Sequence, residues 1–293
     1  MFHIVRHRKY WYLISLLIIV PGLVSLLFRG LNLGIDFTGG SMVEVRFQEE
    51  VSVEEVRTVL AGHGLEQSVI QPSGDRQVLI RTGVISETQN QAMVESLGRE
   101  IGALTVLRNE AVGPVIGKEL VQRAIWALAA TVIAIVAYIS WRFDFKQGLA
   151  AIVALLHDTL IALGIFSLFR LQVDSAFVAA ILTILGYSIN ATIVIFDRIR
   201  ENTKTAKKTE PLEDVVNRSL WDTMARSINT STTVMFMLLA LFFLGGATLK
   251  TFILALMIGV VSGAWSSVCI AGPLWLDLRK RLPWPKRPAG ARA

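Results

Sequence analysis

Six runs of apolar residues, each long enough to cross a bilayer, constrain this chain more than its other features do. They cover residues 12–28, 121–140, 148–169, 175–196, 229–246 and 251–276. A helix needs about 17 to 25 apolar residues to cross the hydrocarbon core of a membrane. With 53% hydrophobic and 18% charged residues, the chain is too apolar for an ordinary soluble domain. We therefore expect an α-helical integral membrane protein with six transmembrane helices.

A polar segment, residues 32–118, separates the first two apolar runs. Strand-like spacing alternates in it with two helical stretches, 51–64 and 86–103, and each helical stretch opens with a capping-box pattern. The capping pairs are Ser52 with Glu55 and Ser86 with Gln89, and the strand-like stretches are 42–47, 67–71, 77–82 and 104–110. The order β-α-β-β-α-β predicts a small α+β ferredoxin-like domain between the first two helices.

The positions of the basic residues predict the topology. An even number of spans puts both termini on one side, and Lys and Arg gather in the short segments on that side. This bias favours cytoplasmic termini and an extracytoplasmic polar domain. The chain then divides into a cytoplasmic N-terminus with the first span, the polar domain, spans two to six with a cytoplasmic loop containing a short helix after Pro211, and a basic tail. These parts cover residues 1–31, 32–118, 119–276 (loop 198–225) and 277–293.

Several function classes are excluded by what the sequence lacks. Its single cysteine, Cys269, allows neither an internal disulfide nor a cysteine-based metal site, and His63 lies between two glycines without a second histidine or cysteine nearby. We therefore expect no metal and no cofactor. The net charge is +6. Because the basic residues cluster beside the apolar runs, the charge indicates lipid and not nucleic acid as the partner. Since H-E-x-x-H is absent and "GYSIN" lacks the second glycine of G-x-S-x-G, Ser188 has no evident base and we expect no enzyme.

Two polar residues lie deep in the third apolar run. His157 and Asp158 are about ten residues into it, which is near the bilayer midplane. A buried acid there either takes up and releases a proton or forms a hydrogen bond between spans. For His157 the alternatives are a role in the proton path and a hydrogen-bonded packing residue. Asn190 in the fourth run either bonds to a neighbouring helix or joins the same path.

Further candidates lie at span ends. Asp197 closes the fourth run, where it either anchors an interface network with neighbouring basic residues or belongs to a hinge that transmits motion. Arg226 opens a hydroxyl-rich stretch at the fifth run and either lines a polar path or extends to the headgroups. A stripe of small residues in the last run packs against a span of this chain or against a partner helix. The stripe consists of Ala255, Gly259, Gly263, Ser267 and Ala271.

Four motifs carry a family resemblance. They are "GIDFTGG" (34–40), "AVGPVIGKEL" (111–120), "LLHDTLIALGIFSLF" (155–169) and "GYSINATIVIFDRIREN" (186–202). In this order, with six spans, the chain resembles the SecF family of protein-export membrane proteins. The matching signature residues are Gly34, Asp36, Gly39, Gly40, Gly186, Tyr187, Arg198, Glu201 and Asn202.

The resemblance implies a fold and a function. The fold would be half of a bundle similar to resistance-nodulation-division transporters, in the bacterial inner membrane. With SecD, the chain would use the proton-motive force to promote late stages of polypeptide export. Its partners would be SecD, the SecYEG translocon, the translocating preprotein and membrane lipid, with YajC and YidC as further candidates. The family has a functional arginine at the position of Arg226.

The chain departs from the family pattern at Ala191. Many family members resemble "GYS-x-N-D" here, and alanine cannot carry the proton that the aspartate is thought to carry. Three explanations remain: Asp158 or a SecD acid serves instead, the stoichiometry differs, or another ion is coupled. An alternative function is half of a resistance-nodulation-division exporter of small molecules or lipids, although the small outer domain argues against it.

Overall fold

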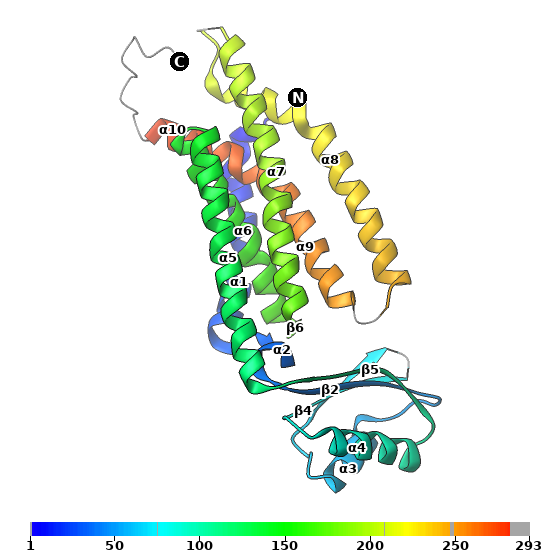
Figure 1. The fold of residues 1–293 in the computed structure, drawn as a ribbon. Helices are drawn as coiled ribbons and strands as arrows, with labels where there is room; N and C mark the ends of the chain where they lie inside the picture. The colour runs from blue at the N-terminus through cyan, green and yellow to red at the C-terminus, as the bar shows by residue number, and fades with distance from the viewer. Residues whose placement is uncertain (1, 75, 208, 247–248, 282–293) are drawn as a thin grey trace. The chain divides into compact units, whose positions relative to one another are not determined.

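The computed structural model describes residues 2–74, 76–207, 209–246 and 249–281 (Figure 1). These residues form two compact units. The helical unit contains the chain up to residue 32, residues 128–171 and the chain from residue 176 onward. The α+β unit contains residues 33–127 and 172–175.

Among the residues that the structure describes, six helices are long and apolar enough to span a membrane, which confirms the predicted number. The first five are α1 (Arg8–Arg29), α5 (Pro114–Arg142), α6 (Phe145–Leu168), α7 (Ser175–Thr205) and α8 (Leu212–Leu244). The sixth is composite and consists of α9 (Lys250–Ser266), a π-helical segment (Ser267–Ala271) and α10 (Gly272–Arg281). A short 3₁₀ turn, η1 (Val5–His7), precedes α1.

The predicted loop at 198–225 is wrong in part, because most of it is helical. Helix α7 continues to Thr205, and α8 begins at Leu212, directly after Pro211. The expected short helix is therefore the first part of the fifth span. The early start is favoured because the first turn of α8 contains two acidic residues, which stabilise a helix at that position. This part of α8 also buries the apolar side chains of Val215, Val216 and Leu220.

Helices α1 and α6 run parallel in close contact. The backbones of Gly22 and Gly164 meet directly, since a Cβ on Gly22 would lie 2.6 Å from the Cα of Gly164. Three residues further along each helix, the hydroxyls of Ser25 and Ser167 are 2.9 Å apart. Both pairs have the same sequence offset, as expected for parallel helices in fixed register. Small residues allow this approach, because no side chain separates the two backbones.

Two glycines of the small-residue stripe contact α7. A Cβ on Gly259 would clash with the side chain of Ile184, and one on Gly263 would lie 3.2 Å from Cβ of Ser188. The stripe therefore packs against a span of this chain. Its last two members, Ser267 and Ala271, are the first and last residues of the π-helical segment. Such segments inside α-helices are frequent at functional sites.

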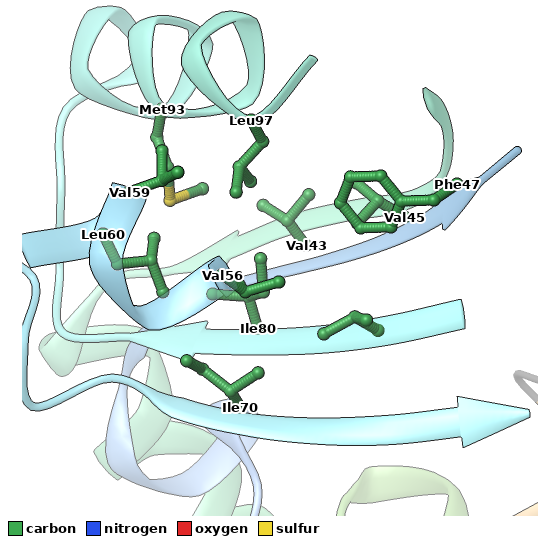
Figure 2. Close-up of a cluster of buried hydrophobic side chains, with 11 residues drawn as sticks. Val43, Val45, Phe47, Val56, Val59, Leu60, Ile70, Ile80, Met93 and Leu97 are labelled. Carbon is green, nitrogen blue, oxygen red and sulfur yellow. The ribbon is translucent and has the colours of Figure 1, made fainter. Parts of the chain in front are cut away.

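The α+β unit confirms the predicted order of strands and helices. The elements that form this order are β2 (Gly40–Phe47), α3 (Val53–Gly62), β3 (Val69–Gly74), β4 (Gln77–Thr82), α4 (Glu87–Glu100) and β5 (Leu104–Val112), and the unit also contains α2 (Ile35–Thr38) and β6 (Gln172–Val173). The sheet order is β3-β4-β2-β5 with antiparallel neighbours, and Val43 pairs with Ile80. Figure 2 shows the core between the sheet and the two helices, where Val43, Val56, Ile80, Met93 and Leu97 meet.

Strand β2 is more buried than its sequence pattern predicts. The alternation in 42–47 is typical of a half-buried strand, but Met42, Val43, Glu44 and Val45 are all buried. Val43 and Val45 pack in the core between the sheet and the helices, and on the opposite face Met42 contacts the side chain of Gln172. The buried carboxylate of Glu44 is stabilised because it accepts a 2.8 Å hydrogen bond from the hydroxyl of Ser73.

The two capping boxes allow a matched pH test. Both form as predicted, at Ser52 with Glu55 and at Ser86 with Gln89. Hydrogen bonds from the backbone N–H and the hydroxyl of Ser52 lower the pKa of Glu55. A carboxyl whose pKa is lowered by folding contributes stability above its unfolded pKa and loses that contribution as the pH falls through the folded value.

We therefore predict that acidification weakens the first turn of α3 but not that of α4, because Gln89 does not titrate. Amide hydrogen exchange of the full chain, expressed as protection factors at each pH, measures this difference. Glu55→Gln is the control and removes the pH dependence at α3. Equal loss of protection at both helices would contradict the prediction.

Candidate functional site

A buried carboxylate with four hydrogen-bond partners lies inside the helical unit. Asp158 of α6 is fully buried. Its Oδ1 lies 2.9 Å from Nδ1 of His157 and accepts a 2.6 Å hydrogen bond from the hydroxyl of Ser262. Its Oδ2 accepts hydrogen bonds from Ser188 at 2.5 Å and Ser266 at 2.8 Å. We call Asp158 and these four partners the Asp158 cage.

The cage continues toward α1 through His157. Its Nε2 lies 2.9 Å from the hydroxyl oxygen of Ser15, and that oxygen also accepts a 3.2 Å hydrogen bond from Nε1 of Trp265. His157 and Ser15 are both buried. One hydrogen-bond network therefore connects α1, α6, α7 and α9 around a single acidic group.

The donors of the cage fit an ionised Asp158. A carboxylate only accepts hydrogen bonds, so Nδ1 of His157 carries its hydrogen toward Asp158. In the neutral tautomer with its hydrogen on Nδ1, the Nε2 of His157 is free to accept from the hydroxyl of Ser15. An ionised acid in a membrane interior is costly unless it is fully bonded, and the four donors meet that requirement. The same network offers two proton acceptors, the carboxylate of Asp158 and Nε2 of His157.

The order Ser15, His157 and Asp158 resembles a serine-hydrolase triad, but the surroundings argue against hydrolysis. Ser15 is 4% exposed and His157 is 6% exposed, so a polypeptide substrate has no access to the hydroxyl. Trp265 also occupies a lone pair of the Ser15 oxygen. Nucleophilic catalysis requires an accessible hydroxyl beside its base. The arrangement is suited to holding a charge or a proton.

Asn190, Arg226 and Asp197 do not join the cage. Asn190 is exposed on α7 and Arg226 is exposed on α8. Asp197 and Arg226 line a cavity of about 300 Å³ between these helices, together with Arg198, Glu201 and Asp222 among others. Asp197 forms a 3.0 Å ion pair with Arg142 of α5, not with the basic residues that follow it in the sequence.

The end of α7 forms a polar network with α8. Arg198 forms ion pairs of 2.8 Å with Glu201 and with Asp222. The amide of Asn202 donates to Asp222 and to Ser219, each at 2.9 Å. These contacts fix the two helices to each other.

Two signature residues lie earlier on α7. The hydroxyl of Tyr187 is 3.1 Å from that of Ser231 on α8, which adds a second polar link between these helices. Gly186, in contrast, has open space where a Cβ would be. Close packing at this point of the chain therefore does not require the glycine.

The first signature motif lies in the α+β unit. The backbone N–H of Gly34 donates to Val173 O at 2.7 Å, and Asp36 accepts from the backbone N–H of Ser175 at 2.9 Å and from its hydroxyl. Gly39 and Gly40 have φ of 73° and 133°, a region that favours glycine. The motif therefore builds a turn that ties residues 172–175 to the start of β2.

Comparisons with known proteins identify the family. The family described as "Protein export membrane protein SecD/SecF, C-terminal" matches residues 91–281, and the "SecD/SecF GG Motif" matches residues 24–51. The Protein translocase subunit SecF of Acidaminococcus fermentans is 44% identical over 96% of this chain and 98% of its own length. That of Haemophilus influenzae is 36% identical over 94% of this chain and 85% of its own length. The chain belongs to the SecF family.

Solved structures agree with this assignment. The crystal structure of SecDF from Thermus thermophilus, described as a translocon-associated membrane protein, matches 96% of this chain with a TM-score of 0.89 and 36% identity. A SecDF structure in a super-membrane-facing form matches with a TM-score of 0.71 and 35% identity. This SecF-family chain spans 39% of the length of each of those chains.

Sequence reasoning found the acid of the cage but missed most of its partners. Ser262 and Ser266 are one turn apart on α9, directly beside the small-residue stripe, and this i, i+4 spacing was the available signal. Ser15 is a hydroxyl in the first span that lies outside both matched family segments. Nothing local to Ser15 indicates a partner in another span.

Proposed function

We propose that this chain is the SecF subunit of a Sec protein translocase and that it uses the proton-motive force to promote late stages of polypeptide export. It acts with SecD beside the SecYEG translocon, in contact with the preprotein and membrane lipid, and YajC and YidC are further neighbours. The chain lies in the bacterial inner membrane with both termini in the cytoplasm. The names of its relatives support this role, and the concentration of basic residues near the termini supports this orientation.

The observation that carries the proton-coupling proposal is the Asp158 cage. Among the described residues of the helical unit, Asp158 is the only fully buried carboxylate. Ionisable groups inside a membrane are rare and mark ion or proton pathways. Because Ala191 leaves the family's usual acidic position without a charge, we assign the proton-binding role to Asp158.

Protonation changes how the cage links the helices. A protonated Asp158 must donate its own hydrogen, so one serine has to become its acceptor and turn its hydroxyl elsewhere. Ser266 has such an alternative, because its hydroxyl is 3.4 Å from the carbonyl oxygen of Gly263. Proton uptake then reverses the hydrogen bond between Asp158 of α6 and Ser266 of α9, and the Ser266 hydroxyl donates within α9 instead, immediately before the π-helical segment.

This exchange couples proton binding to a two-state change. One charge crossing 100 mV supplies about 2.3 kcal/mol, and only a difference in proton affinity between two states of the bundle converts that energy into motion. The two SecDF structures have nearly equal identity to this chain but TM-scores of 0.89 and 0.71. That difference supports a family whose members adopt more than one conformation.

The test is preprotein export into inverted membrane vesicles that contain or lack this chain, each with SecD. We expect the chain to raise the fraction of preprotein that completes crossing, but only while a proton gradient is present. A protonophore should remove the gain, and a sodium gradient alone should not restore it. A gain that follows the sodium gradient would contradict proton coupling.

The same vesicles test the alternative function. If the chain were half of a small-molecule or lipid exporter, it would confer gradient-dependent transport of a fluorescent dye or lipid and no gain in preprotein export. That result would overturn the proposed role in protein export.

A further inference from the structure

A second polar feature of the helical unit is a cavity of about 530 Å³ at one end of the bundle. Its walls come from the end of α5, the start of α6, the end of α7 and α10. The N-terminal end of α1 lies at this end too, since Arg8 forms a 2.9 Å ion pair with Asp277 of α10. The cavity shares no lining residue with the Asp158 cage and is a separate site.

Of the side chains that the structure describes, four basic ones and one acidic one line the cavity, which makes it strongly positive. The carboxylate of Asp144 is engaged with the start of α6, where it accepts hydrogen bonds of 2.9 Å from the backbone N–H groups of Lys146 and Gln147. Asp197 pairs with one of the four basic groups, at 3.0 Å. The basic lining residues are Arg142, Arg200, Lys204 and Arg279.

Arg200 and Lys204 are one turn apart on α7, and both are exposed. Like charges at i, i+4 repel each other and destabilise a helix. An anion bound between them removes this repulsion. Guanidinium groups also match the oxygens of a phosphate in a two-pronged geometry, so the charge and the residue types favour a phosphate ligand.

Aromatic side chains give the cavity an apolar side. Trp141 is 85% exposed and Phe145 is 65% exposed, and both line it. Trp275 is buried on the cavity wall with the guanidinium of Arg279 5.2 Å from its ring, and its Nε1 has no hydrogen-bond acceptor among the described residues. A ligand with an anionic head and apolar chains suits this combination better than a free anion does.

We propose that this cavity binds the phosphate headgroup of an anionic phospholipid. The phosphate lies among Arg200, Lys204 and Arg279, and the acyl chains lie along Trp141 and Phe145. Basic pockets between transmembrane helices recognise such headgroups elsewhere, and exposed tryptophans prefer the membrane interface. The proposal does not depend on proton coupling or on the role in export.

The test is lipid binding to the full chain purified in detergent, measured by native mass spectrometry. Phosphatidylglycerol and phosphatidylcholine with identical acyl chains are compared, and inorganic phosphate is added as a competitor. We expect preferential binding of phosphatidylglycerol that inorganic phosphate does not displace. Removing two positive charges with Arg200→Gln and Lys204→Gln should weaken that binding about 25-fold, at about fivefold for each charge.

The matched control removes two charges that do not line the cavity. Lys9 and Lys207 are exposed in α1 and after α7, and Lys9→Gln with Lys207→Gln should leave phosphatidylglycerol binding within about twofold of the wild-type value. An equal loss in both double variants would overturn the proposal, because it would indicate general attraction to a basic surface. Displacement by inorganic phosphate, or equal binding of both lipids, would overturn it as well.

Discussion

Replacing Asp158 by Asn is expected to abolish the gain in preprotein export that a proton gradient provides. Export without a gradient should be unchanged. Asn has nearly the volume of Asp and can bond to the same serines after their hydroxyls reorient, so the cage stays filled. What Asn lacks is the ability to bind and release a proton. The vesicle assay, with and without a protonophore, measures the gradient-dependent gain directly.

The matched control for this variant is Ser188→Ala. It removes one of the four hydrogen bonds to Asp158, the 2.5 Å contact, but leaves the carboxylate. We expect it to reduce the gradient-dependent gain without abolishing it, because the loss of a hydrogen bond to a charged group costs about 1.5 to 3 kcal/mol. Recovery of the Asp158→Asn protein from the membrane at wild-type levels would show that assembly is intact.

The result that contradicts the assignment is a full gradient-dependent gain in Asp158→Asn. Asp158 would then hold the helices together without carrying a proton, and the coupling acid would have to lie in SecD. Introducing aspartate at Ala191 in the same variant would test the family's usual position. A gain that depends on that aspartate alone would place coupling at that position of α7.

The sequence predicts the elements of the fold because their signals are local. Apolar length reveals the spans, and the Ser52 and Ser86 capping boxes mark the starts of α3 and α4. Polar sequence is less informative after Pro211. The sequence predicts the short helix there but not its continuation into the fifth span, because the burial of side chains such as Val215 and Leu220 arises only in the folded chain. Local sequence patterns thus predict the presence of helices and strands well, but they predict the boundary between a polar loop and a helix less well.

The site is predictable only in part because its contacts are not local. Asp158 is recognisable as a charge at membrane depth, but Ser15 and Ser262 come from spans far away in the sequence. Serines are common in apolar helices, and their sequence neighbours do not say which of them face a carboxylate. The positions of the cage donors therefore depend on the packing of four helices.

The contact between α1 and α6 is also invisible in the sequence, since glycines that touch another backbone look the same as glycines that face open space. Gly22 and Gly164 meet backbone to backbone, whereas a Cβ added to Gly186 would have nothing within 4 Å. The same change, glycine to alanine, should therefore have opposite effects at these sites.

We predict that Gly22→Ala destabilises the full chain by about 1 to 3 kcal/mol, the range for overpacking. The upper end is expected because the new Cβ would lie 2.6 Å from the Cα of Gly164, and a backbone cannot rotate away as a side chain can. Gly186→Ala should instead be neutral or stabilise by up to about 1 kcal/mol, since alanine favours helix over glycine. Thermal unfolding of the purified chain in detergent measures both changes.

A disulfide engineered between α1 and α6 reports whether the loss of stability in Gly22→Ala arises at the contact between these two helices. The hydroxyls of Ser25 and Ser167 are 2.9 Å apart, so Ser25→Cys with Ser167→Cys should cross-link readily when no other residue is changed. Gly22→Ala should slow that cross-linking by pushing the helices apart, and Gly186→Ala should not change it. Unaltered cross-linking together with unaltered thermal stability in Gly22→Ala would mean that the two helices do not approach as closely as their glycines indicate.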